Sequence, residues 1–121
     1  MDKLGYNLRD LLKRVAKHRF SLKTAVQIGH QLVNNLRVLH DKGFVHCDIK
    51  TENIVIGSCD FRSSESSIIY LIDFGVSHRY IDLNGKRLPK KVDIFRGNLL
   101  FASAHALIPQ CKHNALNKSK I

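Results

Sequence analysis

Two polar segments carry residue types and spacings that suit the transfer of a phosphoryl group. Asp48, Lys50 and Asn53 lie within six residues of one another, and Asp73 opens the turn Asp73-Phe74-Gly75 twenty residues after Asn53. Phosphoryl transfer needs a carboxylate that orients the attacking hydroxyl and accepts its proton, a cation on the moving phosphate, and oxygen ligands for Mg²⁺. These four residues can supply that set, so they form the candidate site.

Two helices are predicted ahead of the first segment. Asn7, with Asp10 three residues later, is typical of a helix start, and the apolar residues that follow predict a short helix over about 8–18. Ser21 can cap a second helix, and Gly43 supplies a natural stop. Apolar residues fall on one side of the second helix, which we interpret as a core face: Leu22, Ala25, Val26, Gly29, Leu32, Val33, Leu36 and Leu39.

Short apolar runs rich in β-branched residues follow the second helix. Residues 44–45, 54–56 and 68–72 predict small strands, and the polar stretch 57–67 is interpreted as a solvated loop. Beyond the second segment no period is sustained, and residues 83–91 are expected to form a loop. Both candidate segments then lie at the ends of regular elements, where functional side chains can project.

Length and composition bound the class of protein. The chain has 121 residues, of which 44% are hydrophobic and 25% are charged, values typical of one small globular domain. No apolar stretch approaches the roughly 18 residues that a membrane span needs, and the N-terminus has no signal-peptide core. We therefore predict an intracellular protein, cytoplasmic or nuclear. Cys47, Cys59 and Cys111 share no C-x-x-C spacing, which favours free thiols over a disulfide framework or a zinc site.

The net charge of +10 is unevenly distributed along the chain. Residues 1–42 hold nine bases and three acids (+6), residues 43–85 hold three and six (−3), and residues 86–121 hold eight and one (+7). A nucleic-acid binder normally gathers its bases on one continuous face, and here no stacking aromatic residues interleave with them. We therefore expect no nucleic-acid and no membrane partner, but a site that attracts cations at its centre and anions at its edges.

The two segments resemble motifs of the protein kinases. The first, His46-Cys47-Asp48-Ile49-Lys50-Thr51-Glu52-Asn53, is similar to their catalytic loop H-R-D-x-x-x-x-N, and the second is similar to their D-F-G turn. The resemblance implies that Asp48 is the catalytic base and that Asn53 and Asp73 hold Mg²⁺. It also implies that Lys50 is the lysine by which serine/threonine kinases contact the γ-phosphate of ATP.

Three further segments narrow the resemblance to the casein kinase 1 family. Residues 4–11 are similar to its L-G-P-S-L-E-D-L, residues 20–24 repeat its F-S-L-K-T, and residues 97–103 occupy the place of its G-T-x-R-Y-A-S. The match runs from residue 1 to about residue 107 and so covers most of the chain. The vaccinia-related kinases are the nearest competing subgroup.

This resemblance implies a casein kinase 1-type serine/threonine kinase that transfers the γ-phosphate of ATP to Ser or Thr hydroxyls of protein substrates. The adenine is expected against the hinge at Leu4 and over Val55. The implied fold class is α+β, an incomplete protein-kinase-like fold with mainly the upper part of the helical C-terminal lobe and a small β-hairpin. Its expected parts are the hinge at 1–5, two helices at 8–42, the catalytic loop and strand at 43–56, the metal-binding turn and activation segment at 68–103, and a tail at 108–121.

Several residues depart from the family pattern. Cys47 replaces the arginine of H-R-D, so control by a phosphorylated activation loop is not expected. Asn98 replaces a threonine that bridges base and lysine, although an amide can still donate and accept hydrogen bonds. Leu100 replaces an arginine that holds an acidic or phosphorylated group of the substrate. His46 is expected to pack beneath the D-F-G turn, and a thiol nucleophile at Cys47 is disfavoured because adjacent side chains in an extended loop point apart.

The glycine-rich loop of the kinases has no counterpart in the sequence. None of the seven glycines forms a G-x-G pair, and no V-A-I-K segment is present. We expect the missing N-terminal lobe to be encoded upstream. The alternative hypothesis is a catalytically inactive kinase fragment that acts as a binding module, because positioning the phosphates is most of the catalysis.

Overall fold

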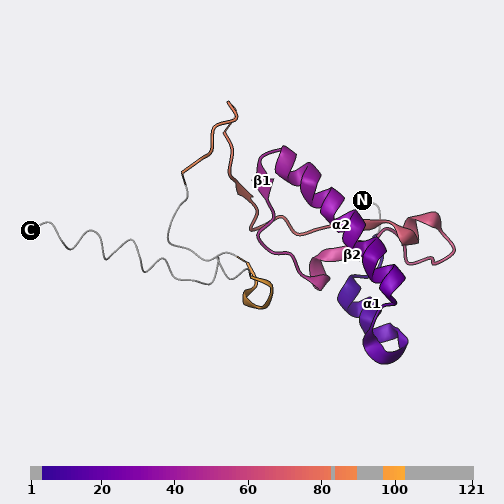
Figure 1. The fold of residues 1–121 in the computed structure, drawn as a ribbon. Coiled ribbons are helices and arrows are strands. Elements are labelled where there is room, and N and C mark those ends of the chain that lie inside the picture. The colour runs from indigo at the N-terminus through magenta and orange to yellow at the C-terminus, as the bar shows by residue number, and fades with distance from the viewer. Residues whose placement is uncertain (1–3, 83, 90–96, 103–121) are drawn as a thin grey trace, which may run out of the picture.

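The computed structural model describes residues 4–82, 84–89 and 97–102. The expectations for residues 1–3 of the hinge, for 90–96 of the activation segment and for the tail at 108–121 lie outside these residues. The described elements, in chain order, are α1 (Leu8–Arg14), α2 (Leu22–Asp41), β1 (Phe44–Val45), β2 (Ile54–Ile56), β3 (Ile69–Leu71) and β4 (His78–Arg79) (Figure 1). This mixture of helices and small sheets confirms the α+β class.

The first helix begins where the sequence predicts and ends earlier. The Asn7 side chain accepts a hydrogen bond from the Asp10 N–H at 2.8 Å, which caps α1. The expected extent of 8–18 is wrong, because α1 ends at Arg14 and a 3₁₀ turn, Ala16–His18, follows it. Lys17 and His18 adopt positive φ values of 63° and 48°, which α-helical residues do not. This reversal brings Phe20 against the hydrophobic core.

The second helix has the predicted limits. The Ser21 hydroxyl accepts the Thr24 N–H at 3.1 Å, and Gly43, with φ of +79°, follows the last turn. The interpretation of its apolar stripe as a core face is correct only in part. Leu32 packs against the core, together with Ile28, which was not part of the predicted stripe. Other members of the stripe are exposed, with fractions of 82% for Leu22, 61% for Val26 and 65% for Val33. The core-facing side is rotated from the stripe because α2 meets the hairpin along the side that carries Gln31 and Asn35.

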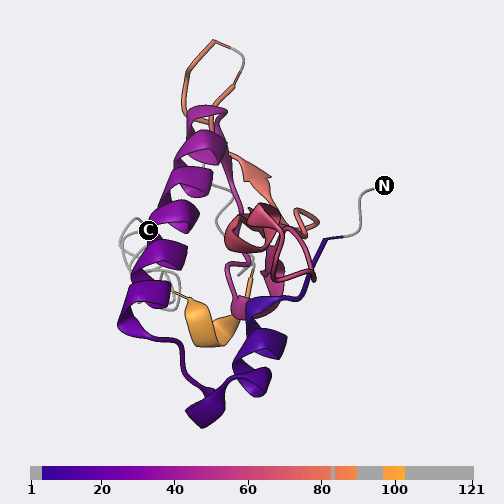
Figure 2. The same ribbon diagram turned by 90° about the vertical axis from the view of Figure 1, so that its right-hand side faces the viewer.

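Two small antiparallel sheets lie beside α2 (Figure 2). In the hairpin, β2 pairs with β3 so that Ile54 faces Leu71 and Ile56 faces Ile69. The other pair joins β1 to β4, a strand that the sequence pattern did not predict. The chain before α1 runs along the free edge of β2, where the Gly5 N–H donates to the Ile56 carbonyl at 2.7 Å.

The core lies between the two helices and the hairpin. Leu8, Ile54 and Ile69 form its buried centre, and the partly buried side chains around it are Leu11, Phe20, Ile28, Leu32 and Leu71. Polar side chains of α2 cover the outer edge of β3. Gln31 accepts the Ile69 N–H at 3.0 Å and donates to the Ser67 carbonyl at 2.9 Å, while Asn35 donates to the Ile69 carbonyl at 3.2 Å. The helix therefore holds the strand that leads into Asp73.

Candidate functional site

His46 joins the two candidate segments. It is only 2% exposed, and its Nε2–H donates to the Ile72 carbonyl at 3.0 Å while Nδ1 accepts the Asp48 N–H at 3.3 Å. Its ring centroid lies 4.9 Å from that of Phe74. These contacts confirm the expected structural role, because one imidazole ties the loop before β2 to the turn after β3.

A network of hydrogen bonds orients Asp48. Its Oδ2 accepts from the Lys50 Nζ at 2.6 Å and from the Asn53 Nδ2 at 2.9 Å. The same Nδ2 donates to the Asp48 carbonyl at 2.9 Å, which fixes the Asn53 amide with Oδ1 turned away. Both partners of the carboxylate bond to Oδ2, so within the described residues Oδ1 of Asp48 remains available to a hydroxyl.

The protonation states follow from this network. The hydrogen bond from Lys50 is the main cause that lowers the pKa of the Asp48 carboxyl, and the bond from Asn53 adds to it against the opposing effect of burial. The bond to Asp48 in turn raises the pKa of Lys50, and the negative charges of Glu52 and Asp73 contribute. At neutral pH the carboxylate is therefore ionised and the ammonium is charged. So weak a base suits a transition state that needs orientation of the hydroxyl more than early removal of its proton.

Asp73 lies beside Asn53 at the end of β3. The Ile72 N–H donates to the Asn53 backbone carbonyl at 2.9 Å, and Asp73 follows with a φ of +61°, which turns the chain sharply. Its carboxylate is exposed, with one oxygen at 3.4 Å from the Gly75 nitrogen. Oδ1 of Asn53 forms no hydrogen bond with a described residue. This oxygen and the Asp73 carboxylate are hard oxygen donors. They fit Mg²⁺, which typically binds through one or two protein ligands together with substrate phosphates and water.

Within the described residues, no group of three or more His, Cys, Asp and Glu side chains could hold a metal ion. The assignment of Asn53 and Asp73 as ligands therefore depends on an amide oxygen and a single carboxylate, and it stays a prediction.

The expected adenine contacts come together on adjacent segments. Leu4 precedes Gly5, which bonds to β2, and Val55 is the middle residue of β2, in a bridge with Asn7. Val55 is only 5% exposed, so little of its surface is open to a ring. The structure thus places the two residues on adjacent segments, and the assignment of their contact with adenine stays a prediction.

Two contacts of the site were missed from the sequence. Arg9 on α1 forms an ion pair of 2.7 Å with Glu52, which ties the helix to the catalytic loop. Gly97 lies so close to this loop that a Cβ there would clash with the Cys47 carbonyl oxygen. Glycine at that position, with φ of +113°, is the only signal the sequence carried for this approach. Asn98 caps the next 3₁₀ turn by accepting the Leu100 N–H at 2.8 Å.

The comparisons agree with this geometry. Residues 3–114 match the model of the protein kinase domain, so the chain belongs to the protein kinase family. Over 107 residues, 88% of the chain, it is 35% identical to a probable serine/threonine-protein kinase of Dictyostelium discoideum. Over 87 residues, 72% of the chain, it is 38% identical to a probable casein kinase I homolog of Encephalitozoon cuniculi. The matched regions span 21% and 25% of these two relatives.

Neither α1 nor α2, nor any other helix within the described residues, combines the length and the apolar character that crossing a bilayer requires.

Proposed function

We propose that this chain provides the catalytic loop and the metal-binding turn of a serine/threonine protein kinase of casein kinase 1 type. The observation that carries the proposal is the network in which Lys50 and Asn53 both bond to Oδ2 of Asp48. Similarity to a casein kinase I homolog and to a serine/threonine kinase supports the subgroup and the substrate class.

In the proposed reaction each residue has a distinct task. Asp48 accepts a hydrogen bond from the substrate Ser or Thr hydroxyl through Oδ1 and takes its proton as the phosphoryl group transfers. Lys50 places its positive charge on the γ-phosphate of ATP. Asn53 and Asp73 are the proposed ligands of Mg²⁺, which when bound neutralises charge on the phosphates. We also propose an intracellular location for the protein.

Replacement of Asp48 tests this function. General bases contribute roughly 10²–10⁴-fold to rate, so we expect Asp48→Asn to slow phosphate transfer by about that factor. The assay measures transfer from radiolabelled ATP to dephosphorylated casein, using the 121-residue chain and the longest product that the gene encodes. Asp60→Asn is the matched control, because Asp60 is an exposed aspartate whose Oδ1 accepts the Arg62 N–H, a bond that asparagine keeps. Undiminished transfer in Asp48→Asn would refute the proposed role of Asp48.

A catalytically inactive chain that acts as a binding module is the second candidate. The burial of Val55 favours it, because a nucleotide would find little open surface on β2. Calorimetry of the 121-residue chain with MgATP separates the two proposals. Micromolar binding accompanied by turnover would exclude the inactive module, and the absence of both in every product of the gene would support it.

A further inference from the structure

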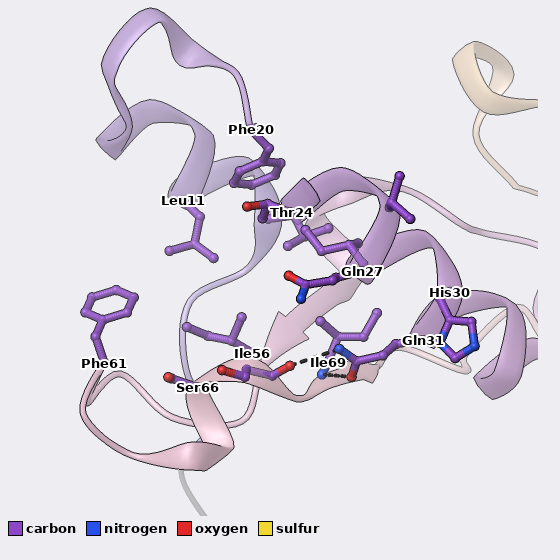
Figure 3. Close-up of a pocket in the computed structure, with 14 residues that line it drawn as sticks. Leu11, Phe20, Thr24, Gln27, His30, Gln31, Ile56, Phe61, Ser66 and Ile69 are labelled. Atoms are coloured by element: carbon purple, nitrogen blue, oxygen red, sulfur yellow. Dashed lines mark hydrogen bonds between the residues drawn. The ribbon is translucent and has the colours of Figure 1, made fainter. Parts of the chain in front are cut away.

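A cavity of about 560 Å³ opens between the two helices and the hairpin, and no residue of the candidate site lines it (Figure 3). Leu11 of α1 and Phe20 form one wall, and Ile56 and Ile69 of the hairpin form the floor. Phe61, from the loop between β2 and β3, forms the opposite rim (Figure 3). The volume falls within the range of about 300–1,000 Å³ that is usual for ligand-binding pockets.

Three of the polar side chains that line this cavity already have hydrogen-bond partners within the chain. Gln31 bonds to Ser67 and Ile69, the Ser66 hydroxyl donates to the Ser63 carbonyl at 2.7 Å, and the Thr24 hydroxyl is 2.9 Å from that of Ser21. These groups have little capacity left for a ligand. The side chains of Gln27 and His30 also line the cavity, without a hydrogen bond to a described residue. Most of the lining is nevertheless apolar, and it includes the aromatic ring of Phe61, which is 66% exposed. An occupant with apolar side chains is therefore favoured over a polar metabolite.

The helix side of the cavity is positively charged, whereas on the loop side the exposed acids Asp60 and Glu65 flank the lining residues Phe61 and Ser66. Residues 13–23, which lead from α1 into α2, hold five Lys and Arg residues and no acid. Arg19 and Lys23 are exposed and directly flank the lining residues Phe20 and Thr24. Neither forms an ion pair with a described residue, in contrast to Arg9 on α1. Unpaired cations at the rim favour a partner that carries negative charge next to its apolar residues.

We propose that this cavity docks a partner polypeptide through a short apolar stretch flanked by acidic residues. The apolar side chains enter between Phe20 and Phe61, and the acidic residues lie against Arg19 and Lys23. Apolar anchors supply most of the affinity in such grooves, while charge at the rim speeds association and selects the partner. The docking surface is separate from the proposed phosphate-transfer site and does not depend on its activity.

The test begins with a displayed library of random twelve-residue peptides, selected on the immobilised 121-residue chain without ATP. The enriched peptides are then labelled, and their affinities are measured by fluorescence anisotropy. Phe61→Asp is expected to weaken binding at least tenfold, because it removes an apolar wall and adds repulsion. Its matched control is Val33→Asp, which alters a side chain that is equally exposed (65%) but lies outside the cavity. That control is expected to stay within twofold of the parent chain.

A second pair of variants tests the charge. Lys23→Glu is expected to weaken binding about threefold or more at low salt, with a smaller effect at high salt, while Lys86→Glu, an exposed control remote in sequence, changes it less than twofold. Circular dichroism establishes that every variant keeps the parent fold. Asp48→Asn should bind peptides normally, so failure of the kinase proposal and failure of this one give different results.

Several outcomes would overturn the proposal. These are a library that yields no enriched peptide, enriched peptides without both apolar and acidic residues, and binding that Phe61→Asp leaves unchanged. Light scattering supplies one more: a dimer of the 121-residue chain that Phe61→Asp dissociates would identify a second copy as the occupant.

Discussion

Replacement of Gln31 tests how α2 holds the strand that delivers Asp73. The side chain of Gln31 makes two hydrogen bonds, to the Ile69 N–H and to the Ser67 carbonyl. In Gln31→Leu the Ile69 N–H, on a residue that is 5% exposed, loses its partner, and a buried unpaired donor costs about 1–3 kcal/mol. The Ser67 carbonyl lies on an exposed residue and can bond to water instead, so its loss adds little. We therefore expect the free energy of unfolding to fall by about 2 kcal/mol.

Urea unfolding followed by circular dichroism measures this change. With a slope of about 2 kcal/mol per M, the midpoint should fall by about 1 M. Gln27→Leu is the matched control, because Gln27 lies one turn earlier on the same helix and its side chain has no hydrogen bond to a described residue. That control should change the free energy of unfolding by less than about 0.5 kcal/mol. Gln31→Glu should lie between the two, since it keeps the acceptor for Ile69 and loses the donor. Equal midpoints for Gln31→Leu and Gln27→Leu would refute the reasoning.

Three further substitutions give distinct outcomes. Gly97→Ala should increase hydrogen exchange in residues 98–101, because its Cβ would clash with the Cys47 carbonyl oxygen of the catalytic loop. A Cβ at Gly85, in an exposed turn, would meet no atom within 4 Å, so Gly85→Ala should cause only local strain. Gly29→Ala should raise the free energy of unfolding by about 0.5–1 kcal/mol in urea titrations, since no atom lies within 4 Å and alanine favours a helix interior. The bond from Lys13 lowers the pKa of Asp10, so this carboxylate stabilises the fold above its ordinary pKa and that contribution is lost as pH falls through the lowered folded value. Lys13→Met should raise the Asp10 pKa in an NMR titration, and an unchanged value would contradict the assignment.

The parts of the fold that depend on local chemistry were predicted well. The caps at Asn7 and Ser21 and the stop before Gly43 were all read from single residues whose backbone preferences are strong. The end of α1 was not predicted correctly. The left-handed turn at Lys17 and His18 is stabilised by the packing of the following chain and not by the backbone preferences of these two residues. Tertiary contact overrode local pattern there.

The packing side of α2 could not be predicted for a related reason. An apolar stripe shows which residues avoid water, but the hairpin approaches the side on which Gln31 and Asn35 meet the edge of β3. Polar side chains thus decide the orientation of this helix, and Leu22 and Val33 are left exposed. Strand β4 was not predicted because its two residues show no alternation of apolar and polar side chains. Only its pairing with β1 defines it as a strand.

The candidate site was read from residue types, and its assembly required the fold. The spacing of Asp48, Lys50 and Asn53 within one loop is local, so the sequence could propose their contact. Asp73 comes close to Asn53 because β3 pairs with β2. Gly97 packs against Cys47, which is more than forty residues earlier in the chain. Neither of these contacts can be predicted from the spacing of residues in the sequence.

The uneven charge of the chain corresponds to two regions of the structure: an acidic region that suits a cation and a basic region that suits a negatively charged partner. In the acidic centre, Lys50 neutralises Asp48 and Arg9 neutralises Glu52, while Asp73 stays exposed and has no ion pair with a described residue. The Asp73 carboxylate and the amide oxygen of Asn53 supply one negative charge and one neutral donor, which suits a divalent cation carrying phosphates better than a bare cation. In the basic segment before α2 the reverse holds, since Arg19 and Lys23 lack acidic partners among the described residues and lie beside apolar surface. High salt should therefore weaken peptide docking at the cavity more than it perturbs the partly buried contacts around Asp48.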